Sequence, residues 1–193
     1  MKRKNFDKIV TAVGFGLAVF LLIAAGLLNW GAGFASDAVS SQLKAQEISI
    51  PAVTGNPDET ADVTKFFVDN GDEILSTAVQ AQMYADHFLG FHLSKMPTYA
   101  AATAASRAAN AAMATDPSDV TLKAEAASKL AMVDTVFKGT VLRGTLLTAY
   151  AFGTLGSIAG ISAIVCLAGA LVMFLLSILG LLHIRRTDED ATI

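Results

Sequence analysis

Two long runs without a charged residue constrain this chain more than any other feature of its sequence. The first run extends from Ile9 to Trp30, and the second extends from Gly144 to Leu182. About 20 apolar residues are enough to cross roughly 30 Å of hydrocarbon as a helix. Backbone N–H and C=O groups find no water inside lipid, so a crossing segment of this kind must be helical. The sequence therefore predicts an integral membrane protein with two transmembrane helices.

The charges beside these runs predict how the chain is oriented. Positive charge next to a span favours the cytoplasmic side, and both ends satisfy this rule only if the chain goes out and comes back. We therefore expect residues 1–8 and 183–193 in the cytoplasm, spans at residues 9–30 and 157–182 of the plasma membrane, and an extracytoplasmic domain at residues 31–156. The flanking basic residues are Lys2, Arg3, Lys4, Lys8, His183, Arg185 and Arg186.

A cleaved secretory signal is the alternative interpretation of the first run. A basic start, an apolar run and small residues at Gly33 and Ala35 are also typical of such signals. The run is longer than the usual core of about 7–15 residues, however, and Trp30 stands where an interfacial anchor is expected. We therefore expect an uncleaved helix.

The second run is too long for the membrane alone. Its 39 residues would form a helix of about 58 Å, nearly twice the hydrocarbon thickness. If Arg185 and Arg186 mark the cytoplasmic end, lipid holds residues 157–182. Residues 145–156 then lie at or above the outer surface, with Tyr150 and Phe152 near the headgroups, where aromatic rings are favoured. This stretch is too apolar to face water, so we expect it to pack on an outward extension of the first helix.

Local signals predict helices through the middle segment. An apolar stripe through Ala35, Val39 and Leu43 extends the first helix to about residue 46, and residues 48–51 are expected to be extended before a proline. The expected fold class is an all-α membrane protein in which both transmembrane helices extend into an extracytoplasmic helical bundle. Further helices are expected from the cap Asn56 to Asn70–Gly71, from the cap Asp72 to Met96, from the cap Thr98 to Met113, and, after a break at Asp116–Asp119, continuously into the second span.

Composition narrows the classes of function. The chain has 193 residues, of which 16% are charged, against about a quarter in a typical soluble domain. Residues 31–156 hold eight Lys or Arg and thirteen Asp or Glu, so this acidic segment is not expected to bind nucleic acid. The lone Cys166 allows no intrachain disulfide.

Catalytic and metal-binding patterns do not emerge from the sequence. His87 and His92 lie five residues apart, whereas metal ligands on one helix usually lie three or four apart. Gly156–Ser157–Ile158 lacks the full G-x-S-x-G elbow of a nucleophilic serine. We therefore expect no enzyme activity, metal ion or cofactor.

Glycines indicate close packing between helices. Gly14, Gly16 and Gly26 lie in the first span, and Gly153 precedes the GxxxG pair of Gly156 and Gly160 in the second. Small residues let helix backbones approach closely in lipid. The packing face that they predict would join the two spans of one chain or the spans of two chains.

Three stretches carry a resemblance to a known family. They are Trp30–Gly31, Tyr84–Ala85–Asp86–His87–Phe88 and the residues from Val136 to Phe152. Together they resemble a family of small actinobacterial membrane proteins of unknown function. This resemblance implies two spans around an extracytoplasmic helical region. Some members are labelled as an aromatic ring-opening dioxygenase, but this sequence lacks a plausible set of iron ligands.

Three hypotheses of function follow. The first is a membrane-anchored structural or accessory protein whose outer domain binds a partner protein or a second copy. The second is a module that binds or senses a small ligand or lipid, and the third is an oligomeric channel lined by Thr11, Ser162 and Ser177. The residues taken as a possible partner or ligand surface lie in the stretches that carry the resemblance: Tyr84, His87, Lys138 and Arg143.

Overall fold

The computed structural model describes residues 3–186, and every regular element in that range is a helix. The described residues contain no β-strand, although Ser49 and Ile74 form an isolated antiparallel bridge. The expected all-α fold is thus confirmed, whereas the predicted tail from residue 187 lies outside the described residues. The elements are α1 (Arg3–Ala45), α2 (Ala61–Asp69), α3 (Ala78–Met83), the π-helix η1 (Tyr84–Leu89), α4 (Gly90–Ser94), α5 (Tyr99–Thr115) and α6 (Val120–Arg186).

Two of these helices are long and apolar enough to cross a membrane, as the sequence predicted. They are α1, with 43 residues, and α6, with 67 residues. The core helix of a soluble protein can be equally apolar, but it is mostly buried. Here only 22% of the most apolar window of α1 and 11% of that of α6 are buried. These helices therefore present apolar side chains outward, as a helix in contact with lipid does.

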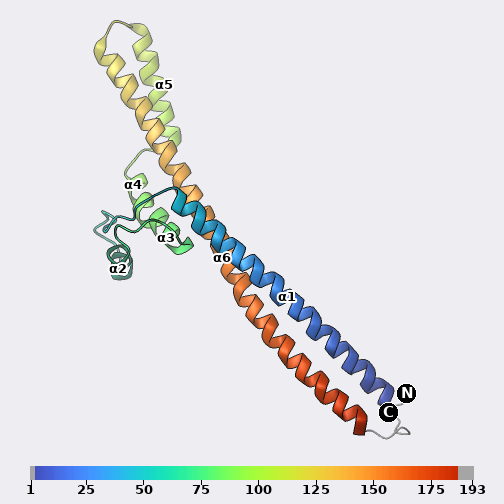
Figure 1. Ribbon diagram of the computed structural model, residues 1–193. Coiled ribbons are helices and arrows are strands. Elements are labelled where there is room, and N and C mark those ends of the chain that lie inside the picture. The colour runs from blue at the N-terminus through green and yellow to red at the C-terminus, as the bar shows by residue number, and fades with distance from the viewer. Residues whose placement is uncertain (1–2, 187–193) are drawn as a thin grey trace. The chain divides into compact units, whose positions relative to one another are not determined.

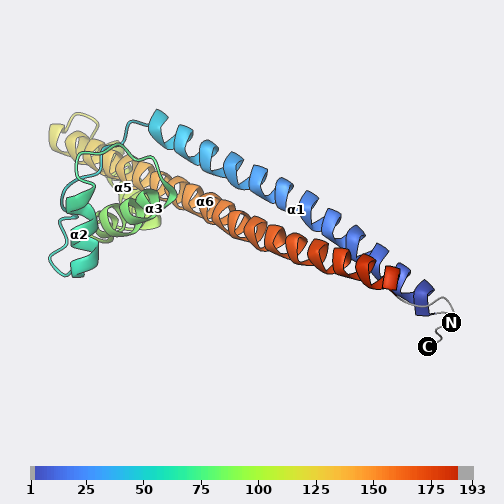
Figure 2. The ribbon, with the colours of Figure 1, turned by 60° about the horizontal axis from the view of Figure 1, so that its bottom comes forward.

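The chain divides into two compact units, which we describe separately. Unit 1 consists of residues 3–37 and 154–186, and unit 2 consists of residues 38–153. In unit 1, α1 and α6 run side by side in opposite directions (Figures 1 and 2). Phe15 and Phe174 form an edge-to-face pair with ring centroids 5.7 Å apart. Where α1 begins and α6 ends, His183 Nε2 lies 3.8 Å from Asp7 Oδ2.

Unit 2 has a small hydrophobic core built from several elements. Its most deeply buried large side chains are Ile50, Phe67, Leu75 and Leu146. Since these come from α2, from α6 and from the two segments that flank α2, the core fixes all of these segments against one another. The complete core consists of Val39, Leu43, Ile50, Phe67, Leu75, Ala81, Ala85 and Leu146.

The predicted start of the first short helix was wrong. Asn56 does not cap a helix, because its side chain accepts a hydrogen bond from Asp58 N at 3.1 Å and forms a turn instead. Helix α2 begins four residues later, where the Thr60 hydroxyl accepts from Val63 N. Its end at the cap Asn70 agrees with the prediction.

Asp72 was also wrongly predicted to cap a helix. It lies in the left-handed region with φ of 66°, and its N–H donates to Ile50 O at 2.9 Å. Residues 72–75 thus pair with the extended residues 48–50 that the sequence did predict. Helix α3 starts only after Thr77, which forms a reciprocal capping box with Gln80.

The helix that follows contains a π-helical segment instead of being uniformly α-helical. Elements α3, η1 and α4 follow one another without a break from Ala78 to Ser94. The N–H of Gly90 reaches Ala85 O, five residues earlier, which is the π-helical spacing. Such wide turns are rare and often occur at functional sites.

Helices α5 and α6 form a hairpin at the far end of unit 2 (Figure 1). Thr98 caps α5 as predicted, and residues 116–119 form the turn. The packed face consists of small residues, since Ala102, Ala109 and Ala126 are buried. Alanine contacts bury little area, so this hairpin is held less firmly than the core of unit 2.

Candidate functional site

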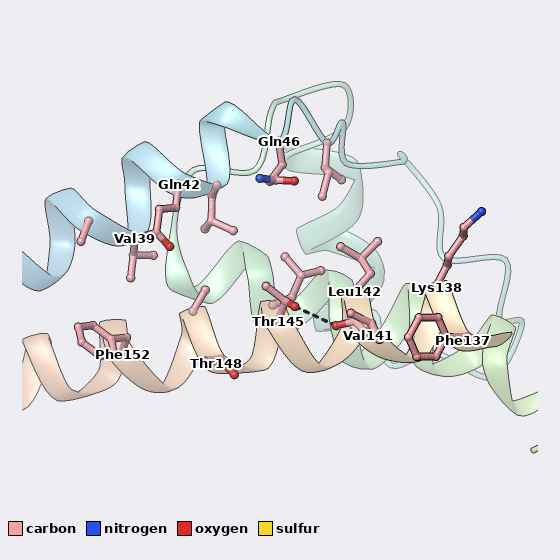
Figure 3. Close-up of a pocket in the computed structure, with 15 residues that line it drawn as sticks. Val39, Gln42, Gln46, Phe137, Lys138, Val141, Leu142, Thr145, Thr148 and Phe152 are labelled. Atoms are coloured by element: carbon pink, nitrogen blue, oxygen red, sulfur yellow. Dashed lines mark hydrogen bonds between the residues drawn. The ribbon is translucent and has the colours of Figure 1, made fainter. Parts of the chain in front are cut away.

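Unit 2 contains an apolar groove. It has a volume of about 610 Å³ and lies between the end of α1 and the middle of α6. Figure 3 shows Val39 and Gln42 of α1 facing the side chains of α6, with Phe152 at one end and Lys138 at the other. Ligand pockets of roughly 300–1,000 Å³ are usually apolar and carry a few polar groups, so this groove has the size and character of a binding site.

The groove follows from the sequence pattern of its two helices. Val39 and Leu43 lie on the stripe that was predicted to extend α1, and both are buried. On α6, Leu146 packs into the same core with only 2% of its surface exposed. The prediction that the apolar stretch after Gly144 packs on the extension of α1 is therefore confirmed for this part of α6. Next to this contact the two helices leave room for the groove.

The polar groups of the groove are few and unevenly placed. Gln42 lies near the end of α1 and Gln46 lies just after that helix, and neither side-chain amide bonds to another residue of the described chain. On α6 the Thr145 hydroxyl donates to Val141 O at 2.9 Å. Lys138 is the single charged residue that lines the groove, and its Nζ lies 2.6 Å from Asp134 Oδ2. The single charge of the groove therefore lies at one of its ends.

Arg143, one of the residues predicted as a possible partner or ligand surface, forms bonds within unit 2 while its side chain stays 40% exposed. Its Nη2 lies 2.7 Å from Asp86 Oδ1, and its Nε donates to Ala85 O at 3.0 Å. Ala85 O also accepts from Gly90 N–H in the π-helical turn. Arg143 therefore connects α6 to the π-helix behind the groove, and it has a structural role in this conformation.

His87 likewise forms an internal contact. Its Nδ1 lies 3.1 Å from Glu59 Oε2, and the Glu59 side chain is only 10% exposed. This contact joins the loop before α2 to the π-helix. Nothing local in the sequence predicts a partner 28 positions away.

Tyr84 is half-buried on the π-helix. Its ring lies 5.0 Å from that of Phe88, measured between centroids. Burial raises the pKa of the Tyr84 hydroxyl above its ordinary value of 10.0. Of the four residues predicted to form a surface, Lys138 alone lines the groove.

The predicted packing glycines have different surroundings. A Cβ atom at Gly156 would lie 2.8 Å from that of Ala35, and one at Gly160 would lie 3.6 Å from that of Ala32. The GxxxG pair thus faces α1 within unit 1. The three predicted glycines of the first span differ from one another. Gly14 faces Ser177 of α6, whereas Gly16 and Gly26 have no neighbouring atom within 4 Å of such a Cβ.

Gly153 belongs to unit 2 and not to the packing of the spans. A Cβ at this position would overlap that of Ala78, the first residue of α3. Gly153 therefore lets α3 approach α6 closely.

The predicted interface anchors differ in how far the structure exposes them. Trp30 is 70% exposed and stacks on Phe34 with ring centroids 5.9 Å apart. Phe152 is 49% exposed and lines the groove, while Tyr150, two residues before it, is partly buried. Arg185 and Arg186 end α6 and are exposed. Their contact with a membrane interface remains a prediction.

Neither a metal site nor a known relative points to a function for the part of the chain that the structure describes. Within residues 3–186 no three His, Cys, Asp or Glu side chains come together as a metal site would require. No protein-family model matches the chain, and no curated protein or solved structure is significantly similar to it. The resemblance to an actinobacterial membrane protein family therefore stays a prediction, and the groove is the feature from which function is argued.

Proposed function

We propose that this protein is a membrane-anchored binding protein that holds an elongated apolar ligand in the groove of unit 2. The main support for this proposal is the groove itself, which has a volume of about 610 Å³ and is lined mainly by apolar side chains. Val141 and Phe152 on its α6 wall are each 49% exposed. An apolar ligand laid along them would remove this surface from water, and such burial is the main driving force for binding. The unpaired amides of Gln42 and Gln46 would orient the ligand.

Photo-crosslinking with acyl-chain probes tests this function. Full-length protein in lipid nanodiscs would be exposed to diazirine-labelled fatty acid, fatty alcohol and fatty acid methyl ester. Mass spectrometry would then compare labelling of residues 137–152 with labelling of residues 157–182, which are expected to contact lipid and serve as the internal reference. We expect groove labelling by at least one probe.

A pair of variants links any labelling to the groove. Ala149 lines the groove, whereas Ala151 is exposed outside it on the same helix. Ala149→Trp should fill the space and abolish labelling of residues 137–152, while Ala151→Trp should leave it unchanged. Equal labelling in both variants, or labelling confined to residues 157–182 in the wild type, would overturn the proposal.

A protein-docking function is the second candidate, and it is favoured by exposed apolar residues on the α5–α6 hairpin. Val120 is 78% exposed, and Leu130 is 59% exposed. A protein contact outside the membrane would remove such apolar side chains from water. A partner protein or a second copy would cover them.

The oligomeric state of the extracted protein tests this second candidate. Leu130→Glu should reduce a higher-order species seen by native mass spectrometry, whereas Thr135→Glu, at another exposed position of the same helix, should not. A wild type that is monomeric in nanodiscs and in mild detergent would count against self-association. The channel hypothesis loses support, because Thr11 and Ser177 are buried within unit 1.

A further inference from the structure

We propose that the groove selects a single-chain amphiphile with an anionic head, namely a long-chain fatty acid carboxylate, whose head lies at Lys138 and whose chain extends toward Phe152. This inference rests on the proposed function and names its ligand class. Two features of the groove support it: its length and the position of its single charge at one end.

The length of the groove matches one extended acyl chain. Along α6 the lining residues run from Phe137 to Phe152, which is about 22 Å at a rise of roughly 1.5 Å per residue. One leaflet of a bilayer gives an acyl chain about 15 Å, half of the roughly 30 Å hydrocarbon thickness. The groove therefore has room for one chain and its head along its length.

The single charge of the groove lies at one of its ends. Figure 3 shows Lys138 at one end and Phe152 at the other, with Gln46 between them and Gln42 beside Val39. No charged residue lines the groove at the Phe152 end. An amphiphile placed the other way round would put its head against apolar side chains, and a desolvated charge without a partner is strongly disfavoured.

The sign of the head follows from Lys138. This side chain is 73% exposed, and its ion pair with Asp134 joins two exposed residues one turn apart on α6. Such surface pairs contribute little stability and exchange readily, so Lys138 can turn to a carboxylate in the groove. The amide group of Gln46 offers further N–H donors on the opposite wall, nearer the middle of the groove.

Comparison of an acid with its methyl ester tests the inference. In the nanodisc assay, the diazirine fatty acid should label residues 137–152 more strongly than the methyl ester of the same chain at pH 7.5. Lys138→Met should reduce labelling by the acid about threefold to fivefold, the size expected for an exposed charge pair, and should leave labelling by the ester unchanged. Lys123→Met, which removes an exposed lysine of α6 outside the groove, is the control.

Removal of the competing carboxylate gives the opposite change. Asp134→Asn frees Lys138 from its ion pair, so labelling by the acid should rise about twofold while labelling by the ester stays the same. This gain cannot arise from a damaged fold, and it keeps the inference testable if Lys138→Met is poorly folded.

The outcomes separate the inference from the function on which it rests. Equal groove labelling by acid and ester in the wild type, or equal effects of Lys138→Met on both, would overturn the carboxylate assignment and leave the binding function standing. Labelling by none of the probes would overturn both. A photo-crosslinker at Val141 that captures a second copy of this chain and no lipid probe would also overturn the inference, in favour of a protein occupant.

Discussion

At the residue scale, Arg143 joins two segments that lie far apart in the chain. It bonds to both Asp86 and the carbonyl of Ala85, and its Nε lies 3.6 Å from the place that a Cβ atom at Gly90 would take. We expect Arg143→Met, which keeps the alkyl chain and removes both bonds, to lower the free energy of unfolding by about 1–2 kcal/mol. Thermal unfolding in nanodiscs would measure this change.

Arg107→Met provides the matched comparison, because Arg107 is exposed on α5. Surface substitutions of this kind usually change stability by less than about 0.5 kcal/mol. If the two variants unfold at the same temperature, the contacts of Arg143 do not stabilise unit 2.

Tyr84 gives unit 2 a dependence on alkaline pH. Its pKa is raised in the folded protein by burial, so the unfolded chain loses this proton first. The stabilising contribution is therefore complete below pH about 10, the ordinary tyrosine pKa, and is lost as pH rises through the higher folded value. The stability of the wild type relative to Tyr84→Phe should fall between pH 9 and pH 11 in urea titrations. A constant difference across this range would contradict the expectation.

At the scale of the elements, the helix pair of unit 1 depends on glycine at selected positions. A leucine at Gly156 would drive its side chain into Ala35, and overpacking of this kind costs about 1–3 kcal/mol. Gly156→Leu should therefore lower the unfolding temperature in nanodiscs. Gly16→Leu makes the same chemical change where nothing lies within 4 Å, so it should have little effect. A reversed order would show that α1 and α6 do not pack through Gly156.

Elements with local signals could be predicted from the sequence, and contacts between distant residues could not. The apolar stripe through Val39 predicted the extension of α1, and Thr98 predicted the start of α5. Thr77 and Gln80 formed a capping box that was readable but was overlooked in favour of Asp72. The contacts of Glu59 with His87 leave no trace in local propensity, because they arise only when the core brings two loops together.

The candidate site was predictable to a similar degree. The segment after Gly144 was correctly expected to pack on the extension of α1, since so apolar a helix cannot face water. The space left beside Leu146 and Val39 depends on how the two helices are held apart by the core, and a one-dimensional pattern does not contain that information. Lys138 was singled out from the sequence, whereas Gln42 and Gln46 were not.

At the scale of the whole molecule, charge asymmetry makes a prediction about topology. Basic residues lie at the start of α1 and at the end of α6, which favours both chain ends in the cytoplasm and unit 2 outside. Single-cysteine variants in a Cys166→Ser background test this arrangement. Ala114→Cys, at an exposed position of α5, should react with a membrane-impermeant maleimide on intact cells.

Asn5→Cys, at an exposed position near the start of α1, supplies the opposite expectation. It should react only after the cells are permeabilised, because residues 1–8 are predicted to lie in the cytoplasm. The reverse pattern would invert the topology, and labelling of both variants on intact cells would mean that the chain does not cross twice. A groove that takes fatty acid carboxylates from outside the cell must itself lie outside the cell. Protection of Ala114→Cys from the maleimide on intact cells would therefore also exclude an extracytoplasmic source for the ligand.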